Sequence, residues 1–467
     1  MRSSFLLGLL LINTFIASGQ SKADLTLNAE QFLSIVRQYH PVVRLANINI
    51  DQSKADILIA QAAFNPRINS YFSDKTFQDT NYYNYRHPNI TIPTWYGIDI
   101  STGIENLDGQ RVDPSQTKGK FGYISVHIPL LKNLVLDKRR AYLKQAKIMN
   151  TMSATERQMI INDLLMNAII AYWDWVNAYN SFNIITKALQ TNKRRFELIK
   201  KSYTNGERPA IDTTEALTQL QLFELQVAES LLNFQNKSLE LNVYFWKENF
   251  IPFNLPQDIT PKESLENELF PIGFTDQLDQ LKKLAQDYHP ELQLYSQKDL
   301  FLQIDKKLKF QEFLPRLDLT YNHLAKGNSI LNSQGFFLDN NYQYGLKFEM
   351  PLFLSQARGE YRKSKLKILE NNIFSIQKRN AINVKLESYF NEFMILKKQI
   401  DVQINLLSNY QAMLRAEESL FLNGESSMFL LNNREIKVLE NEIKLIELKT
   451  KYNKTMYSLQ WCAGQLQ

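Results

Sequence analysis

The chain has 467 residues, of which 44% are hydrophobic and 22% charged, and its formal net charge is +6. Glycine (15) and proline (14) make up about 6% of the residues, roughly half of their usual share, which counts against glycine-rich nucleotide-binding and hydrolase folds. The positive charge is small for this length and scattered along the chain, so it gives no nucleic-acid-binding footprint.

Residues 1–19 predict a secretory signal peptide. A basic second residue precedes the apolar run Phe5–Ile16, and the small residues 17–19 are typical of a cleavage site. The apolar run is too short to cross a bilayer as a helix. Cys462 is the only cysteine, so we expect a mature protein that starts at or near Gln20, is not lipidated and has no intramolecular disulfide.

Beyond the leader, the chain repeats one unit. Tyr39-His40-Pro41 recurs as Tyr288-His289-Pro290, and the run 64–68 recurs as 313–317 at the same spacing. Motifs that match later in the two copies are separated by a shorter distance along the chain. The first copy therefore carries about 27 extra residues inside Ser73–Lys118. We therefore predict a first structural repeat over 20–250, an inter-repeat linker over 251–275 and a second structural repeat over 276–467.

Each copy predicts a helix of about 35 residues, a β-hairpin, a very long helix, a glycine-marked turn and a returning helix. The segments 130–205 and 360–423 contain neither glycine nor proline. The shorter one extends about 96 Å as a helix, whereas helices in globular domains average about a dozen residues. Residues spaced four and three apart form a seam that indicates coiled-coil packing. In the second copy the seam comprises Ile382, Leu386, Tyr389, Phe393, Leu396, Ile400, Gln403, Leu407, Tyr410 and Leu414.

Segments 96–104, 122–128, 317–321 and 342–350 alternate apolar and polar residues. Such strands, with an aromatic-rich apolar side, are typical of a transmembrane barrel wall. Two hairpins are too few for a soluble sandwich or for a barrel closed within one chain, so the open edges require oligomerisation. We predict a lipid-facing set (Ile124, Val126, Ile128, Leu346, Phe348 and Met350) and a lumen-facing set (Ser125, His127, Lys347 and Glu349).

This pattern resembles the TolC-like outer-membrane efflux protein family (outer-membrane factors) over essentially the whole mature chain. The likeness rests on the tandem repeat, on the prolines that begin strands (Pro66, Pro315) or end them (Pro129, Pro351), and on two glycine turns. It implies a mainly α fold with a small β part, built from tandem long helical hairpins and two β-hairpins. Three chains would form a homotrimer, with a twelve-stranded outer-membrane barrel continued by a twelve-helix periplasmic tunnel and an equatorial region around the linker.

The resemblance also implies a function. The chain would be the outer-membrane channel of a tripartite efflux or type I secretion system, located in the cell outer membrane and extending into the periplasm. It would be a passive exit duct for cargo that an inner-membrane RND, ABC or MFS pump delivers through a periplasmic adaptor (membrane fusion) protein. No nucleotide-binding motif, metal-ligand spacing or catalytic arrangement stands out, so we expect no cofactor, metal or enzymatic activity.

The two glycine turns are the most informative local sites. The resemblance implies that they form the periplasmic gate and the adaptor-docking tip. Asp212 falls where the family has a gate aspartate, and threefold symmetry would bring three such carboxylates together. Alternatively, Asp212 is a first-turn acid favoured by the helix dipole, and Arg208 is its nearest candidate partner. The full predicted set is Tyr203, Gly206, Arg208, Asp212, Phe421, Gly424 and Ser426.

Two other classes of protein remain open from the residues. A periplasmic adaptor-like protein would carry one helical hairpin between β domains, but here the hairpin occurs twice and strands precede each copy. A structural coiled-coil protein would explain the seam, but not the amphipathic strands or the glycine turns.

We predict that the mature protein lacks residues 1–19 and carries no acyl chain, because no cysteine stands near the new N-terminus. The intact mass of the protein purified from membranes should equal that of a polypeptide starting at or near Gln20. An extra mass of one or more acyl chains would contradict this prediction.

Overall fold

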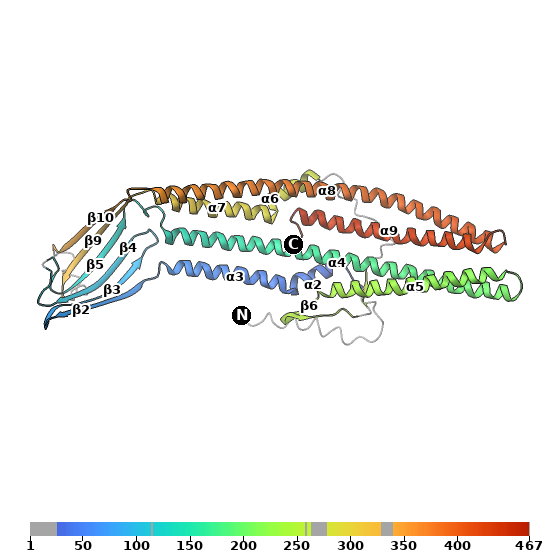
Figure 1. The fold of residues 1–467 in the computed structure, drawn as a ribbon, viewed down its shortest axis with the longest axis horizontal. Coiled ribbons are helices and arrows are strands. Elements are labelled where there is room, and N and C mark those ends of the chain that lie inside the picture. Colours follow the sequence, from blue (N-terminus) through green and yellow to red (C-terminus); the bar gives the residue numbers. More distant parts are fainter. Residues whose placement is uncertain (1–25, 114, 257–258, 263–277, 328–339, 467) are drawn as a thin grey trace, which may run out of the picture. The chain divides into compact units, whose positions relative to one another are not determined.

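The computed structural model describes residues 26–113, 115–256, 259–262, 278–327 and 340–466. The predicted signal peptide and most of the predicted linker lie outside these residues. Within them, the chain is mainly helical with a smaller β part, as the sequence predicts (Figure 1). None of the helices in the described part of the chain combines the length and the apolarity needed to cross a membrane.

The same order of elements occurs twice along the chain. The first series is α2 (Ala29–Tyr39), α3 (Pro41–Ala62), β2 (Arg67–Phe77), β3 (Thr80–Pro93), β4 (Asp99–Asp108), β5 (Gly119–Pro129), α4 (Lys138–Thr204) and α5 (Ala210–Asn242). The second is α6 (Leu278–Tyr288), α7 (Pro290–Gln311), β9 (Arg316–Lys326), β10 (Tyr342–Glu349), α8 (Ser355–Leu422) and α9 (Met428–Cys462). Between them lie the short elements β6 (Trp246–Lys247), η1 (Glu248–Phe250), β7 (Ile251–Pro252) and β8 (Thr260–Pro261), and β1 (Thr26–Leu27) precedes α2.

The chain divides into two compact units, and each takes part of both series. We call Met1–Arg44, Ile161–Lys283 and Val384–Gln467 the helical unit. The sheet unit comprises Leu45–Ile160 and Leu284–Asn383. Helices α4 and α8 run from one unit into the other.

The first helix of each repeat is two helices rather than the predicted one of about 35 residues. The break falls at His40 and at His289, each of which precedes a proline and has an extended backbone, with ψ angles of 131° and 121°. The proline ring clashes with a helical conformation of the residue before it, so the helix ends there. Each proline then begins the next helix, a position that suits its fixed φ and missing N–H.

The two long helices have 67 and 68 residues, which corresponds to about 100 Å each. All ten residues of the seam in α8 are buried or half-buried, and so are their counterparts in α4. The two polar seam residues are hydrogen-bonded to a neighbouring helix. Gln403 donates to the side-chain oxygen of Asn441 at 2.9 Å, and Asn192 donates to Glu435 at 3.0 Å.

Aromatic residues form the centre of the helical unit. Tyr172 and Trp175 on α4 are fully buried, and the ring of Phe32 on α2 stacks on Tyr172 with centroids 5.5 Å apart. The hydroxyl of Tyr172 donates to the backbone oxygen of Leu27 at 2.9 Å, which attaches the N-terminal strand β1 to this core. Helix α5 returns alongside α4, and α9 returns alongside α8 (Figure 1).

The main sheet contradicts the prediction of two hairpins. Over the described residues it has six antiparallel strands in the order β10-β9-β5-β4-β3-β2. The predicted strands correspond to β4, β5, β9 and β10. The first repeat supplies a second hairpin, β2 and β3, because of its extra residues. Three copies with this sheet would supply eighteen strands rather than twelve. Residues 94–98, partly predicted as strand, form the tight turn between β3 and β4 instead, with Thr94 N–H bonded to Ile98 O at 2.9 Å.

We predict that Trp175→Ala lowers the free energy of unfolding by about 3–5 kcal/mol, because it leaves a cavity in the aromatic core. Trp175 is 1% exposed, stacks on Phe234 and donates from Nε1 to Ser238 at 3.1 Å. Urea unfolding in detergent measures the change. Leu225→Ala, at a position 58% exposed on α5, serves as control and should shift it by less than about 0.5 kcal/mol.

Candidate functional site

The register of the six strands places apolar residues on one face of the sheet. Cross-strand partners share a face, and Leu346 pairs with Leu319, which pairs with Ile128. Many of these side chains are exposed in the single chain, including Ile68 (82%) and Phe348 (64%). This apolar face comprises Ile68, Ile90, Ile92, Ile100, Ile124, Val126, Ile128, Leu317, Leu319, Tyr321, Tyr344, Leu346 and Phe348.

Five of the six predicted lipid-facing residues therefore lie together on the apolar face. Met350 follows the last residue of β10 and is 49% exposed, outside the paired strand. The register shows that these five residues share a face. Contact of this face with lipid stays a prediction.

The opposite face of the sheet carries all four predicted lumen residues and is polar near the ends of β5 and β10, whereas Tyr85, Leu107 and Tyr123 lie on it farther along the strands. Ser125 pairs with Asn322, and His127 pairs with Thr320, whose hydroxyl lies 3.2 Å from the ring Nδ1. On β10, Lys347 and Glu349 lie on this same face and form an ion pair at 3.6 Å. We call this surface the polar face, and its role as a lumen stays a prediction.

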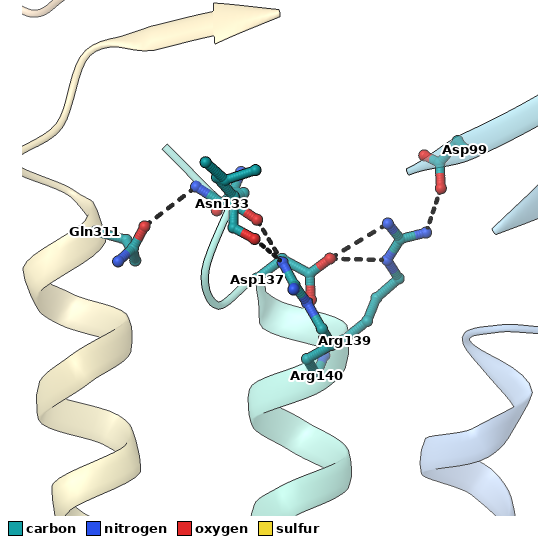
Figure 2. Close-up of polar contacts among 7 residues, drawn as sticks. Asp99, Asn133, Asp137, Arg139, Arg140 and Gln311 are labelled. Carbon is teal, nitrogen blue, oxygen red and sulfur yellow. Dashed lines mark hydrogen bonds and ion pairs between the residues drawn. The ribbon is translucent and has the colours of Figure 1, made fainter. Parts of the chain in front are cut away.

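A charged cluster fastens the sheet to the start of α4 (Figure 2). Asp137 caps the helix by accepting from the backbone N–H of Arg140 at 2.8 Å, as acidic residues at this position commonly do. Arg139 bonds both to Asp137 at 3.3 Å and to Asp99 at the start of β4 at 2.8 Å. Burial opposes the charge of Arg139, but Asp99 and Asp137 more than offset this, so the pKa of its guanidinium is raised.

The turn between β3 and β4 is fitted to the same cluster. Gly97 has a φ of +86°, and a Cβ added there would lie 2.6 Å from a terminal nitrogen of Arg140. Next to it, the ring of Trp95 stacks on Phe64 with centroids 4.1 Å apart. The sequence prediction missed this cluster, although the Asp137-x-Arg139-Arg140 run at the start of a long helix was a visible capping signal.

A cleft of about 510 Å³ opens at this end of the sheet unit. Its lining contains residues of both charges. It also includes residues of the polar face, among them the predicted lumen residues His127 and Glu349. Within this lining, Lys132 and Glu312 form an ion pair at 2.5 Å. The surface here is thus strongly hydrophilic and close to charge-balanced.

The two glycine turns, here called the tip turns (residues 203–209 and 421–427), have the same backbone geometry. Gly206 and Gly424 have φ angles of +74° and +78°, which glycine adopts without strain. The residue after each glycine donates to the carbonyl five positions back at 2.9 Å. This is a Schellman ending, in which a left-handed residue stops the helix and satisfies its last carbonyls.

Arg208 joins the two tip turns. Its guanidinium lies 3.9 Å from the centroid of the Phe421 ring and donates to the Phe421 backbone oxygen at 2.5 Å. A third contact is the ion pair with Asp212 at 3.4 Å. Pro209 is the N-cap of α5, so Arg208 precedes the helix and reaches Asp212 from outside it. The two candidate partners named from the sequence are therefore in contact.

The remaining predicted tip residues have distinct environments. Phe421 is 6% exposed and packs with Ile199, Ala216, Met428 and Leu431, whereas Tyr203 is 46% exposed. The hydroxyl of Ser426 donates to the buried carboxylate of Glu417 on α8. The neighbouring Ser427 caps α9 by accepting from the N–H of Leu430 at 3.3 Å.

A second connection between the repeats was not predicted. Glu435 on α9 is 7% exposed and accepts from Arg195 on α4 at 2.6 Å and from Asn192 at 3.0 Å. Arg195 also lies 3.5 Å from Glu418 on α8. The only sign of this connection in the sequence was the polar residue Asn192 in the seam. Its partner Glu435 is more than two hundred residues away along the chain.

Comparisons with known proteins find relatives by fold. No protein-family profile and no curated protein matches the sequence. Among solved structures, the CmeC outer membrane channel of Campylobacter jejuni is 14% identical, with 94% of this chain and 85% of that chain covered and a TM-score of 0.64.

Two further solved structures are similar to the same extent. The outer membrane protein VceC of Vibrio cholerae is 12% identical, with coverage of 93% and 96% and a TM-score of 0.64. The open state of the MtrE outer membrane channel of Neisseria gonorrhoeae is 11% identical, with coverage of 96% and 94% and a TM-score of 0.66. The mainly helical fold with a smaller β part, which the sequence resemblance implies, is thereby confirmed for the single chain.

We predict that Phe348→Arg impairs assembly by roughly 2–4 kcal/mol if Phe348 faces lipid near the bilayer midplane. Lys347→Ala, one residue away on the polar face, should assemble normally. The yield of heat-sensitive oligomer from outer membranes measures both variants. Equal yields would mean that the lipid and lumen faces are wrongly assigned.

We predict that Arg208→Ala loosens the two tip turns, because it removes charged hydrogen bonds of about 1.5–3 kcal/mol together with the ring contact. Resting conductance in planar bilayers should rise. Arg194→Ala is the matched control, since its side chain bonds only within α4 among the contacts recorded for it. Conductance equal to wild type in both variants would show that Arg208 does not hold the two tip turns closed.

Proposed function

From the fold that this chain shares with bacterial outer-membrane channels, we propose that it is the outer-membrane channel of a tripartite efflux or type I secretion system. In this proposal three copies form a homotrimer in the outer membrane and extend into the periplasm. The channel is a passive exit duct with porin-like conductance. The energy for transport comes from an inner-membrane RND, ABC or MFS pump.

The observation that carries the proposal is the two-sided sheet. Its apolar face exposes Phe348, Leu346 and Ile68, and such a surface suits lipid rather than water. Its polar face carries serine, histidine, lysine and glutamate side chains, which suit a water-filled lumen. A membrane strand needs every backbone group paired, and assembly of copies into a closed barrel meets that need.

The tip turns support the periplasmic half of the proposal. In this reading they face the periplasm, and the adaptor protein docks on them. Arg208 and Phe421 hold the two hairpins of one chain together, so an adaptor that separates them would widen the mouth. Asp212 is already paired with Arg208 within its own chain, which makes it part of this latch.

The proposal is tested by locating and reconstituting the full chain. The protein should fractionate with outer membranes, migrate as a trimer on unheated gels and conduct ions in planar bilayers. A strain that lacks it should accumulate a fluorescent pump substrate, and wild type should restore export while Phe348→Arg should not. A monomer in the periplasmic fraction would contradict the proposal and favour the adaptor-like alternative.

A further inference from the structure

The hairpin of β2 and β3, here called the inserted hairpin, is an integral part of the sheet. Strand β3 pairs with all eleven residues of β2, from Arg67 to Phe77, and with β4 at eight recorded positions from Asn84 to Pro93. Its apolar residues continue the apolar face, since Ile92 pairs with Ile100 and Ile100 with Val126. If the hairpin merely projected from a four-stranded wall, its apolar side chains would not need to lie on the same face as those of β4 and β5.

The base of the inserted hairpin is also fixed to the helices. Two contacts hold it, the Arg139–Asp99 ion pair at 2.8 Å (Figure 2) and the Trp95–Phe64 stack. The backbone at Gly97 leaves no room for a side chain beside Arg140. The partners of these contacts lie on α4 and at the end of α3. The hairpin therefore enters the sheet at the same level as the other strands.

The two edge strands lack neighbours on their outer sides within the described residues. Every residue of β10 and all but one of β2 are exposed. All neighbouring strands are antiparallel, so the first and last of six strands run in opposite directions. If β2 of one copy meets β10 of the next, the pair is antiparallel and the apolar face stays on one side.

We infer that β2 of each copy pairs with β10 of the next, so that the barrel wall contains six strands per copy. This inference rests on the proposed homotrimer, for which it gives an eighteen-stranded barrel. Barrel diameter grows roughly linearly with strand number. The lumen is thus about 1.5-fold wider than that of a twelve-stranded barrel, in the size range of aqueous porins.

Disulfide cross-linking tests the edge pairing. The starting variant is Cys462→Ser, which removes the single native thiol. Asn69→Cys or Ser73→Cys on β2 is combined with Gln343→Cys or Lys347→Cys on β10, all on the polar face. Mild oxidation of outer membranes should link copies covalently up to the trimer in at least one of these combinations.

The matched control places the first cysteine on β4, as Ser101→Cys, with the same β10 partners. In a six-stranded wall Ser101 is two strands from the edge, so intermolecular linkage should be at least tenfold lower. Linkage through Ser101 and none through β2 would overturn the inference, since the wall would then end at β4. That outcome leaves the proposed trimer intact, whereas a wild type that stays monomeric overturns both.

Lumen width gives an independent measurement. Because β2 ends and β5 begins at the same end of the sheet, residues 78–118 can be replaced by an Asn-Gly turn that closes a β2–β5 hairpin. Polyethylene glycols of graded size, added from the barrel side, report the largest polymer radius that enters. The limit should fall by about one third in the excised variant if it assembles, and an unchanged limit would overturn the inference.

Discussion

The alternation of the main sheet is the constraint on which the rest of the structure depends. A slip of one residue in any strand would turn apolar side chains such as Phe348 to the polar side and Lys347 to the apolar side. The chain prevents this at the base of the sheet, where Asp137 caps α4 and Arg139 holds Asp99 at the start of β4. Helix start and strand register are thus set by one charged cluster.

The tip turns and the helices next to them depend on a few polar contacts between segments far apart in sequence. Arg208 bonds to the backbone of Phe421, and Arg195 bonds to the buried Glu435. Ion pairs that lose their water contribute little net stability, but breaking one partner is costly. Such contacts therefore strongly favour one arrangement of these segments.

The sequence was sufficient for features with a local cause. Glycine- and proline-free segments, the four-three seam and the alternation in β5 and β10 predicted the long helices and the two-sided strands. The inserted hairpin was missed because β2 mixes Ser70 and Asp74 with Ile68 and Phe72 on one face, so its alternation is weak. Contacts such as Arg208 with Phe421 depend on the tertiary fold and leave no signal at short range.

The chain enters the sheet after Pro66 and leaves it at Pro129, and both points lie at its base. Any hairpin inserted between them adds two strands, preserves strand direction and leaves the helices where they are. In a threefold assembly each insertion changes the circumference by six strands at once. In the proposed trimeric pore, the width of the lumen would therefore change only in steps of six strands, through one loop and with the sequence of the helices unchanged.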